Sequence, residues 1–333
     1  MREYSHMTTQ RQQAQPIDGV TGLLDLFDRF PLVALGEMHG VEQGAQFIEA
    51  LVRHPTFSER ATAIVVEFGN AFHQQVVDDY IAGGDVELFA LRGVWQDLLG
   101  AGPWGFREAI YPSFFASVRA VNESLPEARR IRVLLGDPPV NWKAVRTRAD
   151  LDAFADRDGH FARVVVDDVL RTGQRALLLA GAFHLLRAEP FISPTPHAAP
   201  MNLVQRLEHE YPGSTYVVVP HSDISEPERV EIERQLASWP TPCIAAIRGT
   251  WLQDVSAYSV FGQCITWVLP DGTTKRPVAS PGLTLGDLFD AYLYLGPIAE
   301  LTNADENHRP LDDEDAAEVA RRKAFFAPLY QDD

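Results

Sequence analysis

Short apolar runs alternate along this chain with longer stretches in which apolar residues recur at helical spacing. The runs have the length and the aliphatic composition of buried strands, and they cover residues 32–35, 62–66, 130–135, 176–180 and 215–219. The helical stretches cover residues 20–30, 42–54, 71–82, 113–122, 151–171 and 202–210. This alternation predicts an α/β fold with a largely parallel central sheet and helices on both of its faces.

The same pattern predicts one domain with a polar tail at each end. Residues 18–300 are expected to form a single α/β domain, in which residues 243–247 and 263–269 add further strands and residues 283–295 close the fold. Glycines interrupt a helical pattern near residues 85–125, and we interpret this region as a helical insertion over the carboxyl ends of the strands. Residues 1–17 form a polar N-terminal tail, and residues 301–333 an acidic, loosely held C-terminal tail.

Composition narrows the class of partner. The formal net charge of −17 disfavours nucleic acid, and the short basic clusters at residues 129–130 and 321–323 are interpreted as solvated helix faces. No apolar stretch approaches the roughly 20 residues that cross a bilayer, so no membrane partner is expected. The first 17 residues lack the apolar core of a secretory signal, which makes the cytoplasm the expected compartment. Cys243 and Cys264 are expected to be reduced core residues.

Four of the apolar runs end on residues that transfer protons or bind metals. The first run ends at Glu37, with His39 two positions later; the second ends at Glu67, the third at Asp137, and His184 follows the fourth. The carboxyl ends of parallel strands meet at one edge of a sheet, where ligands bind. We therefore expect these side chains to line one crevice.

Each candidate also has a purely structural interpretation. Glu37 could accept hydrogen bonds from the amides that open the next helix, and Glu67 could pair with an arginine from a covering helix. Asp137 precedes a proline, so a turn and a site role are equally well supported. A lone histidine such as His184 is usually a loop residue, and His73 is an auxiliary candidate because it could reach the crevice from its helix.

The chemistry that remains is hydrolysis by an activated water. The chain has no Gly-x-Ser-x-Gly, Gly-x-Gly-x-x-Gly or His-Glu-x-x-His motif, so serine hydrolase, dinucleotide-binding and zincin sites lose their usual support. A histidine could deprotonate water while a glutamate orients it. Alternatively, Glu37, His39, Glu67 and His184 could hold a divalent metal ion that lowers the pKa of a bound water to roughly 7. The sequence leaves both schemes open.

At these residues the chain resembles the erythromycin esterase family and, more distantly, the ChaN haem-binding and TIKI/TraB-type proteins. Residues 35–40, Leu-Gly-Glu-Met-His-Gly, look like the first motif of the family, and Val66-Glu67 looks like the second. Residues 81–85, 118–122 and 135–137 resemble its later segments, and the likeness covers roughly residues 30–190. The short Glu-x-His spacing and the Ala-Gly-Ala-Phe-His segment ending at His184 are more similar to the ChaN and TIKI branch than to the esterases.

The resemblance implies that His39 is a general base and that Glu37, Glu67 and His184 line the same pocket. We expect hydrolysis of an ester, lactone or amide in a small-molecule substrate. The main alternative is a non-catalytic haem- or metal-binding protein that uses the same crevice, and a catalytically inactive scaffold is a third. Haem would need an apolar slot, which four aromatic residues could line: Trp95, Trp104, Phe106 and Tyr111.

Overall fold

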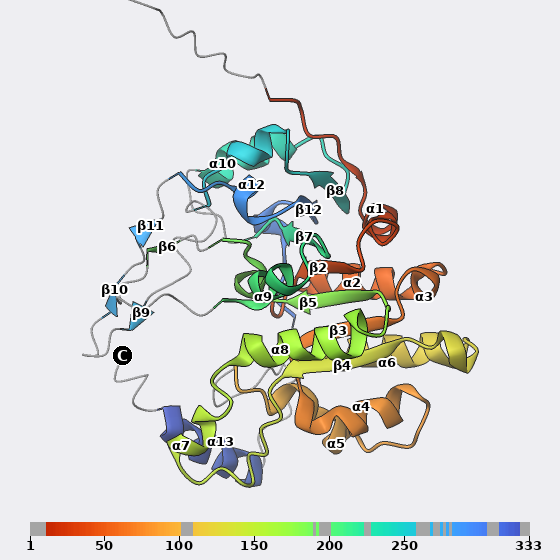
Figure 1. The fold of residues 1–333 in the computed structure, drawn as a ribbon, viewed down its shortest axis with the longest axis vertical. Helices are drawn as coiled ribbons and strands as arrows, with labels where there is room; N and C mark the ends of the chain where they lie inside the picture. Colours follow the sequence, from red (N-terminus) through yellow and green to blue (C-terminus); the bar gives the residue numbers. More distant parts are fainter. Residues whose placement is uncertain are drawn as a thin grey trace, which may run out of the picture.

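An eight-stranded sheet forms the centre of the protein (Figure 1). The computed structural model describes residues 11–100, 109–188, 191–192, 201–222, 228–257, 267–268, 274–275, 278–279, 282–304 and 313–326. The strand order is β1-β8-β12-β7-β2-β5-β3-β4. The strands are β1 (Ile17–Asp18), β2 (Leu32–Gly36), β3 (Ala63–Asn70), β4 (Arg132–Asp137), β5 (Ala176–Ala180), β7 (Thr215–Pro220), β8 (Cys243–Ala246) and β12 (Ala291–Tyr294).

Six neighbouring strands, from β12 to β4, run parallel, and β8 is antiparallel to both β12 and β1. The predicted, largely parallel α/β sheet is therefore confirmed. Its central strands are buried along their whole length, which explains why β2, β3 and β5 read as continuous apolar runs instead of alternating ones.

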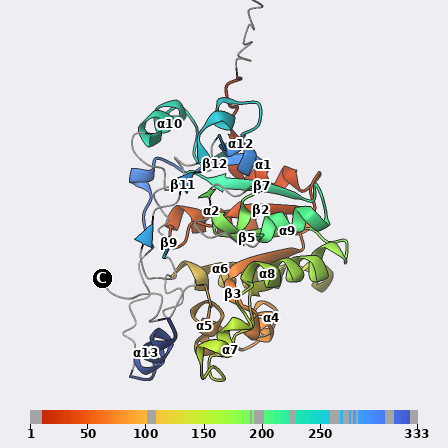
Figure 2. The same cartoon turned by 60° about the vertical axis from the view of Figure 1, so that its left-hand side comes forward.

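Alternate residues of the central strands enter two separate cores. In β2, Leu32 and Ala34 face one core, while Val33 and Leu35 face the other. The first core is covered by α8 (Arg157–Val165), η4 (Val166–Leu170), α9 (Leu203–Glu210), α10 (Glu228–Leu236) and α12 (Leu285–Leu288). The second is covered by α1 (Gly19–Leu26), α2 (Glu42–Arg53), α3 (Phe57–Arg60), α4 (Gln74–Ile81), α5 (Leu88–Gln96) and α6 (Ile110–Glu123). The sheet thus has helices on both faces, as Figure 2 shows from a second side.

The helical region near residues 85–125 has two parts with different positions. Helix α6 packs against α2 and α4 and belongs to the layer on the second face. The segment that follows α5 reaches the carboxyl ends of the strands, where the amide of Leu99 donates a hydrogen bond to the Asp137 carboxylate. This segment is the part of the insertion that covers the strand ends.

Two expected elements differ from the structure. The stretch 151–171 is not one helix: α7 (Arg148–Asp152) ends early, Asp156 caps the start of α8, and η4 continues α8 with a wider turn. Of the expected strand at 263–269, the described residues are β9 (Trp267–Val268), which pairs with β10 (Thr274–Lys275) outside the central sheet. A second small pair joins β11 (Val278–Ala279) to β6 (Phe191–Ile192).

Residues 283–295 contribute both α12 and β12, and β12 enters the sheet between β7 and β8. Cys243 is a buried free thiol on β8, while Cys264 lies outside the described residues.

The acidic C-terminal region contains a helix, α13 (Asp313–Phe326), which lies beside α7 (Figure 1). The Arg148 guanidinium on α7 donates a hydrogen bond to the carbonyl of Phe325 on α13. Arg322, which we interpreted as part of a solvated face, is 9% exposed and ion-paired with Asp97. Part of the region expected to be a loosely held tail is thus a helix that contacts the rest of the protein. In the parts of the chain that the structure describes, we find no helix with the length and apolarity needed to span a bilayer.

Candidate active site

The ends of four adjacent strands bring the candidate side chains together. Strand β5 lies between β2 and β3, and β4 pairs with β3 on its other side. Glu37 directly follows β2 and its amide donates a hydrogen bond to Ala180, the last residue of β5. This register places the residues after β2 and after β5 next to each other at this edge of the sheet.

Glu37 and His39 form one half of the site. The Glu37 side chain is buried, and its Oε2 atom contacts Nδ1 of His39. The His39 side chain keeps 39% of its surface exposed. With Nδ1 held by the carboxylate, the Nε2 atom of His39 is the ring nitrogen that faces Glu67, at 4.0 Å from its Oε2 atom.

Glu67 is the centre of the site and contacts groups from three elements. Its Oε2 atom accepts a hydrogen bond of 2.7 Å from the amide of Gly181, just after β5. Its Oε1 atom lies 3.0 Å from Nε2 of His184 and 3.2 Å from a terminal nitrogen of Arg157. A buried carboxylate is stable as an anion only with such partners, which explains how Glu67 can lie within the fully buried strand β3. The strand continues past Glu67 to Asn70, whereas the sequence predicts that it ends at Glu67.

His184 lies on η5 (Ala182–Leu185), a short turn that begins directly after Gly181. Its Nδ1 atom is 2.6 Å from a carboxylate oxygen of Asp158, so both ring nitrogens contact acids. The close packing here leaves little space at Gly181: a Cβ atom at this position would lie 3.1 Å from Nε2 of His39 and 3.3 Å from Oε2 of Glu67.

Arg157 and Asp158 are site residues that the sequence did not reveal. Both lie in the first turn of α8, and Arg157 joins Glu67 to Asp137 through a 2.7 Å contact between its Nε atom and Oδ1 of Asp137. A helix that precedes a parallel strand begins at the carboxyl edge of the sheet. The signal that could have found them is Asp156, a helix-capping residue type inside the stretch that we expected to be one helix.

The remaining candidates lie at different places. Asp137 is buried and supports Arg157 instead of contacting the histidines. His73 is not part of this cluster: its Nε2 atom lies 2.8 Å from the Asp97 carboxylate, in a neighbouring polar group. The structural interpretation of Glu67, a pairing with an arginine from a covering helix, is also realised, in the same cluster as the histidines.

The charges of the site stabilise one another. Burial lowers the pKa of His39, but the carboxylates of Glu37 and Glu67 outweigh that effect and raise the pKa to about 9. Burial likewise lowers the pKa of His184, but Glu67 and Asp158 raise it to about 10. Burial raises the pKa of Glu67, yet the two imidazoles and Arg157 hold it well below its usual range. The resting site thus contains imidazolium and carboxylate groups at neutral pH.

As arranged, these residues do not fit a divalent metal ion. Both ring nitrogens of His184 contact carboxylates, and Nδ1 of His39 contacts Glu37. The Arg157 guanidinium contacts Oε1 of Glu67. A metal ligand needs a free lone pair, and a neighbouring cation opposes a second positive ion. Within the described ranges, no group of three or more His, Cys, Asp or Glu side chains could hold one.

Two of the aromatic residues expected to line a haem slot are core residues instead. Trp95 is 2% exposed and stacks on Phe115, while Tyr111 is 1% exposed and packs against Phe68. Their rings are enclosed by the second core, so they do not form an open slot. Trp104 and Phe106 lie outside the described residues.

Comparisons with known proteins identify the fold. No family model matches the chain, and neither does any curated protein. A mutant of erythromycin esterase EreC in its open conformation is similar with a TM-score of 0.52 and 13% identity, over 86% of this chain and 94% of that one. A Bacillus cereus protein gives a TM-score of 0.54 with 10% identity over 85% and 94% of the two chains. A succinoglycan biosynthesis protein gives 0.52 with 11% identity over the same shares. The chain therefore has the fold of erythromycin esterase EreC, which is the fold that the resemblance seen in the sequence implies.

Proposed function

We propose that this protein is a hydrolase that cleaves an ester, lactone or amide bond in a small-molecule substrate, with a water activated by His39. The observation that carries the proposal is the geometry of His39: Nδ1 is held by buried Glu37, and Nε2 lies 4.0 Å from Oε2 of Glu67. That gap is too long for a direct hydrogen bond, but one water can bond both atoms at about 2.8 Å each.

In this arrangement each group has one task. The Glu37 carboxylate fixes the orientation of the His39 ring and stabilises it when it gains a proton. The Glu67 carboxylate is held by Gly181, Arg157 and His184, so its position is set before a substrate binds. A water between His39 and Glu67 would therefore be oriented by two fixed groups.

The proposed reaction transfers one proton to His39 and returns it. Nε2 of neutral His39 takes a proton from the water as the oxygen attacks the carbonyl carbon, which gives a tetrahedral intermediate. The bond to the leaving group then breaks, and the imidazolium donates its proton to the departing oxygen or nitrogen. Because the pKa of His39 is raised to about 9, roughly 1% of the protein holds neutral His39 at pH 7.

The fold supports this class of reaction. The similar EreC structure is of an erythromycin esterase, which shows that the fold hosts ester cleavage. The chemistry of the site favours a substrate with an electrophilic carbonyl.

A substrate screen tests the proposal. Purified full-length protein is assayed against panels of aryl esters, lactones and aryl amides, with the His39→Ala variant and a chelator-treated sample in parallel. We expect turnover of at least one panel, loss of about 100-fold or more in the variant, and no effect of the chelator. Turnover that survives in a folded His39→Ala variant would reject this role of His39.

A further inference from the structure

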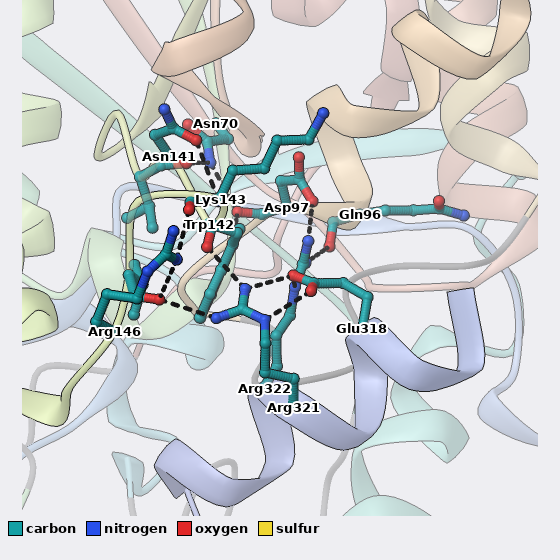
Figure 3. Close-up of polar contacts among 12 residues, drawn as sticks. Asn70, Gln96, Asp97, Asn141, Trp142, Lys143, Arg146, Glu318, Arg321 and Arg322 are labelled. Atoms are coloured by element: carbon teal, nitrogen blue, oxygen red, sulfur yellow. Dashed lines mark hydrogen bonds and ion pairs between the residues drawn. The ribbon is translucent and has the colours of Figure 1, made fainter. Parts of the chain in front are cut away.

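Helix α13 is fastened to the protein through two adjacent arginines (Figure 3). Arg321 donates hydrogen bonds to the carbonyls of Trp142 and Val145. Arg322 lies 2.5 Å from the Asp97 carboxylate, donates to the carbonyl of Gln96, and stacks over the Trp142 ring with its guanidinium carbon 4.6 Å from the centroid. With 10% of its side chain exposed, Arg322 is a buried anchor and not a surface charge.

The segment that Arg322 holds contacts two residues of the site, Asp137 and Arg157. The carbonyl of Asp97 accepts hydrogen bonds from the side chains of Asn70 and Trp142. Two residues later, the amide of Leu99 donates to Oδ2 of Asp137 at 2.7 Å. Gly100 then lies against Arg157, so closely that a Cβ atom there would be 2.1 Å from the guanidinium carbon.

Apolar packing joins the same parts of the molecule. A small core separate from the two large ones contains Val140, Trp142, Val145 and Leu151. Leu99 from the covering segment and Phe325 from α13 both pack against this core. The helix and the covering segment are therefore held to a common support by charge, by hydrogen bonds and by apolar contact.

From Leu99 a continuous series of contacts reaches Glu67. Asp137 is a buried acid whose partners are the Leu99 amide and Arg157, and Arg157 also contacts Glu67. Burial raises the pKa of Asp137 although Arg157 opposes the shift, so its anionic form depends on these donors. If the Leu99 amide moves away, Asp137 loses a donor and its hold on Arg157 weakens.

We infer that Arg322 is a positioning residue for the candidate active site, acting through the segment 97–100, Asp137 and Arg157 on Glu67. It touches none of the reacting groups itself. The expected effect on kcat/KM rests on the proposed function. The structural coupling between Arg322 and the segment 97–100 is tested separately, by hydrogen exchange.

The experiment compares full-length Arg322→Gln with Arg234→Gln, a control that removes an arginine from an exposed pair with Glu231. Hydrogen exchange of the peptide that contains Leu99 is expected to be at least about fivefold faster in Arg322→Gln and unchanged in the control. Equal exchange in both variants would overturn the inference, whether or not a substrate is known.

Enzyme kinetics provide a second test of the inference. With a substrate in hand, Arg322→Gln is expected to lower kcat/KM about tenfold, to move the acidic limb of the pH profile upward, and to be rescued in part by Arg322→Lys. In a double-mutant cycle with Arg157→Lys the two losses should not add, because both act through Glu67. Fully additive losses would contradict the route through Arg157. Absence of any turnover in the wild type would instead refute the proposed function. In that case hydrogen exchange of the Leu99 peptide alone would decide whether Arg322 is coupled to the segment 97–100.

Discussion

The imidazole of His184 lies 3.0 Å from the carboxylate of Glu67, although Glu67 lies on β3 and His184 follows β5. His39 approaches the other oxygen of the same carboxylate. Glu67 therefore connects two histidines that each have a second acid: Glu37 beside His39, and Asp158 beside His184. This alternation of acids and imidazoles governs the charge state of the whole site.

The rate of hydrolysis should rise with pH. If neutral His39 is the base, its raised pKa of about 9 means that kcat/KM increases about tenfold per pH unit between pH 6 and pH 8 and levels off near pH 9. Initial rates across this range, corrected for spontaneous hydrolysis, measure the slope. A profile that is flat or falling over this interval would speak against His39 as the base.

Removing the charge of Glu67 should disable the site. In Glu67→Gln both imidazoles lose a shared anionic partner, and the water loses its acceptor, so we expect kcat/KM to fall about 100-fold or more. Glu49→Gln is a matched control, because Glu49 pairs with Arg53 on α2 away from the site. If both variants retain full activity, Glu67 has no catalytic role.

A single methyl group at Gly181 should crowd the site without unfolding the protein. The backbone there has φ −55° and ψ 145°, which alanine adopts without strain. Its Cβ atom, however, would lie 3.1 Å from Nε2 of His39, the atom proposed to accept the proton. We expect Gly181→Ala to lower kcat/KM about tenfold while the melting temperature changes little, and unaltered kinetics would show that the space beside His39 is not used.

Stability should decline at alkaline pH. A histidine whose pKa is raised by folding contributes stability that is complete below about 6.5 and is lost as the pH rises through its folded value. For His184, with a pKa of about 10, this contribution is on the order of a few kcal/mol. Denaturant melts should therefore show falling stability between pH 7 and pH 10, and the slope should be smaller in His184→Gln. Parallel slopes would indicate that folding does not shift the pKa of His184.

The strand ends could be predicted from the sequence because their signal is local. A buried parallel strand contains a run of apolar residues, so the runs in β2, β3 and β5 stand out, together with the polar residues that come after each run. Arg157 and Asp158 do not stand out, because charged residues in the first turn of a helix usually face solvent. Their role depends on where α8 begins, which the continuous helical pattern of residues 151–171 concealed.

Helix α13 was missed for a related physical reason. An acidic segment with adjacent arginines has the composition of a solvated surface, and Arg322 becomes a buried anchor only through Asp97 and Trp142, which are remote in the sequence. For His73 the sequence suggested a contact that the structure does not show. His73 is close to Glu67 along the chain, but its side chain pairs with Asp97. Contacts set by tertiary packing cannot be predicted from spacing alone.

Titration of the histidines by NMR tests the central claim most directly, because it requires no substrate. The imidazole C–H resonances of His39 and His184, assigned with the His39→Gln and His184→Gln variants, are followed from pH 5 to pH 11 in the wild type and in Glu67→Gln. The structure predicts midpoints of about 9 for His39 and about 10 for His184, and a decrease of both in Glu67→Gln. Midpoints near 6.5 that do not move when Glu67 is replaced would contradict a site built around this carboxylate.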